Sequence, residues 1–172
     1  MLYSVDHLNL ALNWYNVGHV HPPNQENVKL FEIDGGTIHK LIKVVFKHPE
    51  LAEEKKMQMM NEYLGTNNSD LAINMRYSCI ASLPDPEKKE VVWNELIDPS
   101  STYSIYQRKA KMQGFYSWHQ IELCRPYFDK FFETLSDLES NHIYKYVEVF
   151  FSSMIPNFEI EDRHIVKLLK IK

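Results

Sequence analysis

The chain has 172 residues, of which 44% are hydrophobic and 13% aromatic, with 19 Lys and Arg against 23 Asp and Glu. This length suits one globular domain, and the net charge of -4 argues against a dedicated nucleic-acid binder, which usually concentrates positive charge on one face. No apolar stretch is long enough to span a membrane and the first residues carry no basic signal region, so we expect neither a membrane span nor a secretory signal. The two cysteines, Cys79 and Cys124, lie in helix-like patterns and favour a reducing compartment, hence the cytoplasm.

The hydrophobic pattern predicts a series of short amphipathic helices and no strands. The first helix is expected over residues 5–17, before Gly18 and a break at Pro22-Pro23. The second is expected to be capped by Thr37 and to end before Pro49. Residues 1–36 are therefore a less regular N-terminal segment of a single helical domain that spans residues 1–172.

Helix breakers and capping residues divide the rest of the chain. Gly65 is expected to end a helix over residues 50–64, Ser69 to cap one over 70–82, and Pro86 to lie in the first turn before a helix over 87–97 that buries Val91. Further helices are predicted over residues 101–114, 118–135 with a break at Pro126, 141–155 and 160–171.

The helix starts recur with a period. Alternate helices begin about 32 to 42 residues apart, which is typical of stacked helical repeats. We therefore expect an all-α fold of stacked antiparallel helix pairs in a HEAT- or armadillo-like superhelical array. A closed helical bundle is the alternative, because its loops can produce similar spacings.

The search for catalytic chemistry is mostly negative. None of the eight histidines is followed by Glu, so the zinc-binding His-Glu-x-x-His helix is absent. His19 and His21 form the closest histidine pair, but they lack further ligands at matching spacing and are interpreted as exposed loop residues. His119 lies five residues before Cys124, on a different helical face, so both cysteines are interpreted as core residues.

Aromatic residues are abundant in the last third of the chain, and at helical spacing they are interpreted as packing residues between helices. They are Tyr127, Phe128, Phe131, Phe132, Tyr144, Tyr146, Phe150 and Phe151.

A set of short sequences in a fixed order resembles the C-terminal helical domain of the aminopeptidase N family of zinc metallopeptidases. The set covers about residues 55–156. It comprises Ser69-Asp70, Arg76 to Asp85, Lys89, Trp93 to Leu96, Met112 to Phe115, Gln120, Leu123, Arg125 to Tyr127, Phe131-Phe132, and Phe151 with Ile155-Pro156.

The resemblance implies that this chain is part of a longer enzyme whose zinc and catalytic groups lie in another domain. The helical domain of that family closes over the active site, limits access to peptides and helps to hold their distal ends. The zinc motif and the amine-recognition motif Gly-x-Met-Glu-Asn are both missing here, so no catalytic or metal-binding residue can be assigned and the chain is expected to be inactive alone. The expected partners are the rest of the aminopeptidase and peptide substrates.

Arg76, Arg108 and Lys109 are candidate peptide-binding residues, since a cation on the inner surface can pair with a peptide's C-terminal carboxylate. The alternative interpretation is that each is a solvated surface charge. A freestanding helical-repeat interaction module is the alternative function. A helical enzyme that uses His119, or the cluster Glu161, Asp162 and His164, is a weaker third hypothesis.

Overall fold

The computed structural model describes residues 5–25, 27–156, 162 and 165–166. Most of the described chain is helical, which confirms the all-α prediction. The predicted helix over 160–171 lies outside the described residues, apart from three isolated positions. The helical elements are α1 (Val5–Val17), α2 (Gly35–Lys47), α3 (Glu53–Leu64), α4 (Asp70–Ala81), α5 (Pro86–Ile97), α6 (Ile105–Phe115), the 3₁₀ turn η1 (Trp118–Gln120), α7 (Ile121–Cys124), α8 (Pro126–Asn141) and α9 (Tyr144–Met154).

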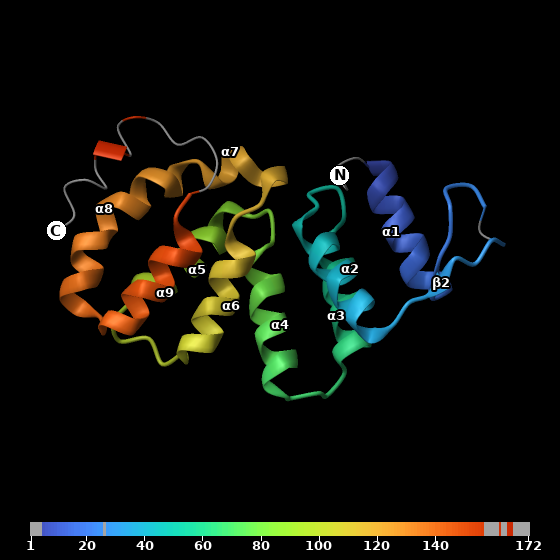
Figure 1. Cartoon of the computed structure of the whole chain (residues 1–172), viewed down its shortest axis with the longest axis horizontal. Coiled ribbons are helices and arrows are strands. Elements are labelled where there is room, and N and C mark those ends of the chain that lie inside the picture. Colours follow the sequence, from blue (N-terminus) through green and yellow to red (C-terminus); the bar gives the residue numbers. More distant parts are fainter. Residues whose placement is uncertain (1–4, 26, 157–161, 163–164, 167–172) are drawn as a thin grey trace.

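The prediction of no strands was wrong. Strands β1 (His19–Val20) and β2 (Phe31–Glu32) form a small antiparallel ladder at one end of the molecule (Figure 1). Gly18, with a φ of 73°, turns the chain after α1 into this hairpin. Two residues per strand are too few to produce a recognisable alternation of polar and apolar side chains.

Most helix starts follow local capping chemistry. The Ser69 hydroxyl accepts a hydrogen bond from the backbone of Ala72, and Pro86 opens α5 behind the Asp85 cap, as the sequence predicts. The Thr37 prediction was wrong, because α2 begins two residues earlier. Asp34 is its cap and accepts a 2.7 Å bond from the Thr37 backbone N–H.

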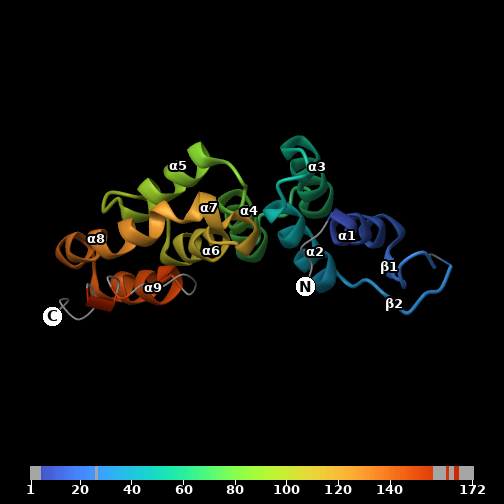
Figure 2. The same cartoon turned by 90° about the horizontal axis from the view of Figure 1, so that it is seen from above.

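The described residues form four hydrophobic clusters, and α4 contributes to the two largest. The N-terminal cluster joins α2, α3 and α4 through Ile42, Phe46, Met60, Leu64, Ala72, Met75, Cys79 and Leu83. The C-terminal cluster joins α5, α6, α8 and α9 to the end of α4 through Ala81, Val92, Trp93, Leu96, Met112, Phe115, Tyr127, Phe131, Phe132, Leu135, Leu138, Tyr146, Phe150 and Met154. Figures 1 and 2 show α4 between α2 on one side and α6 on the other.

The contact between α4 and α6 is unusually close. A Cβ atom added to Gly114 would lie 2.0 Å from the backbone oxygen of Ser78, so only glycine fits there. The two helices run parallel, because Asp70 and Ser104 at their N-terminal ends line one pocket while their C-terminal carbonyls share Lys89.

The predicted aromatic core is confirmed in large part, since Tyr127, Phe128, Phe131, Phe132, Tyr146 and Phe150 are buried. Tyr144 and Phe151 are exposed on α9, and Val91 on α5 is 58% exposed although the sequence predicts it inside. The buried face of α5 consists of Lys89, Val92, Trp93 and Leu96. The apolar pattern alone therefore places Val91 inside wrongly and leaves Lys89 out.

Candidate functional site

Arg76 holds the turn between α3 and α4. Its guanidinium donates hydrogen bonds of 2.7 Å to the Asn67 carbonyl and 2.9 Å to the Gly65 carbonyl. Carbonyls at the end of a helix have no partner within the helix, and a cation there satisfies them and complements the helix dipole. Arg76 thus ties the C-terminal end of α3 to α4.

Arg108 is buried on α6 and is engaged on several sides. Its guanidinium donates to the carbonyls of Ser101 (2.8 Å) and Asp98 (3.3 Å), and it lies 4.6 Å from the centre of the Tyr146 ring. The Nε atom is buried without a hydrogen-bond partner. Arg108 also lines a pocket of about 250 Å³ between the end of α5 and the start of α9.

Lys109 is exposed on α6, beside the buried Arg108. The structure therefore does not bring the three candidate residues together. Arg76 and Arg108 mainly bind backbone carbonyls, whereas Lys109 faces solvent.

The sequence reasoning missed three buried lysines, Lys56, Lys89 and Lys111. Lys111 pairs with the Glu95 carboxylate at 2.6 Å, whereas the other two bind backbone carbonyls. Lys89 on α5 donates to the carbonyls of Ala81 and Phe115, the last residues of α4 and α6, and Lys56 on α3 donates to the His48 carbonyl just after α2. Burial lowers the pKa of the Lys56 and Lys89 ammonium groups to about 8. The sequence signal was available for Lys89, because Val92 and Trp93 follow it by three and four residues on the same face.

Neither cysteine is placed as a nucleophile. Burial raises the pKa of the Cys79 thiol to about 12 and also raises that of Cys124, so both stay protonated at neutral pH. The Cys124 thiol donates to the Phe115 carbonyl at 3.7 Å rather than to a histidine. The interpretation of both cysteines as core residues agrees with their full burial.

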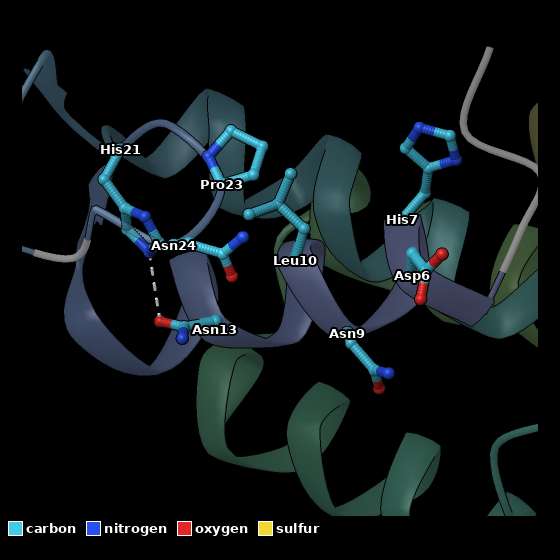
Figure 3. A pocket seen from close by; sticks show the side chains of 8 residues that line it. All are labelled: Asp6, His7, Asn9, Leu10, Asn13, His21, Pro23 and Asn24. Atoms are coloured by element: carbon cyan, nitrogen blue, oxygen red, sulfur yellow. Dashed lines mark hydrogen bonds between the residues drawn. The ribbon is translucent and has the colours of Figure 1, made fainter.

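A pocket of about 490 Å³ lies between α1 and the loop after β1 (Figure 3). His21 at one end and His7 at the other are well separated along α1, so they form no histidine pair. The His21 ring contacts the Pro22 carbonyl (2.8 Å) and the Asn13 side chain (3.2 Å). This pocket offers amides and one carboxylate, Asp6, but no nucleophile with a neighbouring base.

The interpretation of His21 as an exposed loop residue was wrong, because its side chain is buried against α1. Its ring lies edge-on to His19 with 5.8 Å between centres, and both of its nitrogens are already engaged. Over residues 5–25 and 27–156, no three His, Cys, Asp or Glu side chains are grouped closely enough to hold a metal ion.

A second histidine pair, not recognised from the sequence, lies where α2 meets η1. The rings of His48 and His119 are 5.6 Å apart at their centres, although the residues are far apart in the chain. Gln120 holds this junction, since its side-chain amide donates 2.8 Å bonds to the carbonyls of Lys47 and Ser82. No sequence pattern predicts this meeting, because it depends on how α2 and α4 pack.

Comparison with known proteins assigns no family. No protein-family model matches the chain, and no curated protein matches it. Within the described part of the chain, no helix is both long and apolar enough to cross a membrane.

Proposed function

We propose that this chain is the C-terminal helical domain of an aminopeptidase N-type zinc metallopeptidase, and that it caps the active-site chamber and controls which peptides enter. The parent enzyme removes N-terminal amino acids from peptides, with its zinc ion and catalytic groups in another domain. Closure of such a chamber excludes water and folded chains while short peptides pass.

The proposal is supported by where the residues of the resemblance lie. Trp93, Phe115 and Tyr127 pack together, with ring centres 4.9 to 6.0 Å apart. Gly114 permits the close contact of α4 with α6, and Gln120 joins the ends of α2 and α4. The matching residues therefore belong to the packing framework, which is where a shared fold constrains a sequence most strongly.

The arrangement of the helices supports a stacked array. The C-terminal ends of α2 and α4 meet at Gln120, those of α4 and α6 meet at Lys89, and Arg108 of α6 packs on Tyr146 of α9. Helices α2, α4, α6 and α9 are thus successive neighbours, with α3, α5 and α8 connecting them. This is the order expected of HEAT- or armadillo-like helix pairs.

The experiment combines this chain with an aminopeptidase N-type enzyme that keeps its zinc domain but lacks its own C-terminal helical domain. We expect the chain alone to hydrolyse no leucyl p-nitroanilide with added zinc, but to bind the truncated enzyme and restore its discrimination between short peptides and folded proteins. Turnover by the isolated chain would contradict the missing catalytic centre, and a failure to associate would contradict the proposed domain role.

Lys109 provides the test of peptide contact. If it pairs with a peptide's C-terminal carboxylate, Lys109→Ala raises KM of the recombined enzyme for peptide acids but leaves KM for peptide amides unchanged. Lys145→Ala is the matched control, because Lys145 is an exposed lysine on α9 that is already paired with Glu148 at 2.8 Å. Equal effects of the two changes would remove Lys109 from the candidate site.

A freestanding interaction module remains the alternative function, and one observation favours it. Ile80 and Val91 are exposed beside a mainly apolar pocket of about 250 Å³ formed by α4, α5 and α6. Exposed apolar side chains at a concave site are typical of protein-binding surfaces. Recovery of a stable complex that excludes any peptidase would favour this alternative over the domain role.

A further inference from the structure

The junction of α2 with η1 contains a histidine whose polar atoms are unused. The His48 side chain is only 4% exposed, and neither its Nδ1 nor its Nε2 has a hydrogen-bond partner. A buried polar group without a partner costs free energy, so this ring is a candidate for contact with a ligand. The half-buried His119 ring lies beside it at 5.6 Å.

Lysines from α2 adjoin the histidine pair. Lys47 directly precedes His48, and Lys43 lies one helical turn earlier on the same side of α2. Both side chains are half-buried, and neither forms a hydrogen bond or ion pair with another described residue.

The surroundings of the junction are electropositive. Burial and the neighbouring Lys43 lower the pKa of Lys47, while burial, His48 and Lys47 lower the pKa of His119. The Cys79 thiol also faces Lys43 and Lys47, but it is protonated at neutral pH. Apart from burial, the described groups that shift the pKa values of Lys47 and His119 are lysines, a histidine and a protonated thiol, and no carboxylate is among them.

The backbone carbonyls at the C-terminal ends of nearby helices are already bound by other donors. The carbonyls that end α4 and α6 accept from Lys89, and the carbonyls of Lys47 and Ser82 accept from Gln120. The His48 carbonyl accepts from Lys56 at 2.6 Å. Each of these carbonyl oxygens therefore already accepts a hydrogen bond from another residue. None of them accepts one from the Lys43 or Lys47 ammonium group or from the His48 ring.

We propose that Lys43, Lys47, His48 and His119 form a binding site for a compact oxyanion with two negative charges, such as inorganic phosphate or a phosphate monoester. Lysine ammonium groups and imidazole N–H groups are strong donors to phosphate oxygens. A dianion balances the two lysine charges. The unpartnered His48 ring lies at the buried end of the site, and its nitrogens are covered, so binding requires a side-chain movement that exposes one of them. The half-buried Lys47 and His119 form its entrance from solvent.

Inorganic phosphate is the probe for this site. Histidine-ring nitrogen NMR spectra of the full chain are recorded during a titration with phosphate, and with chloride at matched ionic strength. We expect the resonances of His48 and His119 to shift and saturate with phosphate only. The ring of His142, which is bonded to the Ile97 carbonyl at the far end of the molecule, serves as the internal control and should not respond.

Two matched substitutions locate the site. Lys47→Gln should weaken phosphate binding about tenfold or more, because it removes a charged donor. Lys40→Gln, which removes the same charge from an exposed position of α2, should change the affinity by less than about twofold.

The proposal is overturned if phosphate and chloride act alike, or if both substitutions weaken binding equally. It is also overturned if a dipeptide with a free carboxylate shifts the same rings while phosphate does not, since the site would then select carboxylates. These outcomes do not depend on association with a peptidase, so they are separate from the test of the proposed domain role.

Discussion

The two largest hydrophobic clusters of this protein are built from different side chains. The C-terminal cluster contains Trp93, Phe115, Phe131 and Phe150, whose rings meet in tilted, edge-on and stacked contacts. The N-terminal cluster contains one fully buried ring, Phe46, and otherwise consists of aliphatic residues, Cys79 and flexible methionines such as Met60 and Met75. Rigid rings define a single packing arrangement, whereas methionines adapt, so we expect the C-terminal helices to be less tolerant of change.

Gly114→Ala tests this intolerance and should have the largest effect. The new Cβ would overlap the Ser78 backbone, which no side-chain rotation can relieve, so α4 and α6 must separate and open the aromatic cluster. We expect a loss of more than about 4 kcal/mol in the free energy of unfolding, measured by urea denaturation.

Gly36→Ala is the control, since its Cβ would lie 3.6 Å from the nearest heavy atom, an Asp34 carboxylate oxygen, in the first turn of α2. It should change stability by less than about 0.5 kcal/mol. If both substitutions lower the free energy of unfolding by similar amounts, the close contact of α4 with α6 does not have the special importance predicted here.

The pH dependence of stability should report on Lys89. Its pKa falls from 10.5 in the unfolded chain to about 8 in the folded one, so the unfolded chain holds more protons between these values. Stability should therefore rise with pH across this window, by about 2 kcal/mol between pH 7.5 and 9.5 from this residue. Chemical denaturation at each pH measures the rise.

Lys89→Met retains the packing of the stem and should remove that part of the slope. Lys88→Met is its neighbour control, because the Lys88 ammonium is partly exposed and pairs with Glu53. An unchanged slope in Lys89→Met would show that Lys89 does not titrate across this range.

Arg76→Met should have a smaller effect on stability than the substitutions of Gly114 and Lys89, and the effect should be local. It leaves the Gly65 and Asn67 carbonyls to water, which costs about 1 to 2 kcal/mol. Hydrogen exchange should quicken in the turn between α3 and α4 and remain unchanged in α8. Equal acceleration in both places would indicate that Arg76 supports the whole molecule rather than the boundary between its clusters.

The sequence predicted those elements whose boundaries depend on local chemistry. α1 has the predicted bounds, Gly65 follows α3, Ser69 caps α4, and the chain breaks at Arg125 before Pro126. These outcomes follow from caps, glycine and proline, which act within a few residues.

Features that depend on distant contacts were missed. The pairing of β1 with β2, the buried lysines and the meeting of His48 with His119 all require knowledge of which helices lie together. The candidate cations Arg76 and Arg108 were selected by charge alone, but their guanidinium groups donate to backbone carbonyls in the segments that follow α3 and α5. Charge predicts that a residue needs a partner, but it does not predict which one.

The close approach at Gly114 also bears on how distant relatives of this chain can be recognised. A protein that shares the α4–α6 crossing must keep glycine at that point whatever its remaining residues are, because the restriction comes from the main chain of the facing helix. A short profile built on this glycine, the aromatic residue after it and the tryptophan of the preceding helix would be a sharper search query than overall identity.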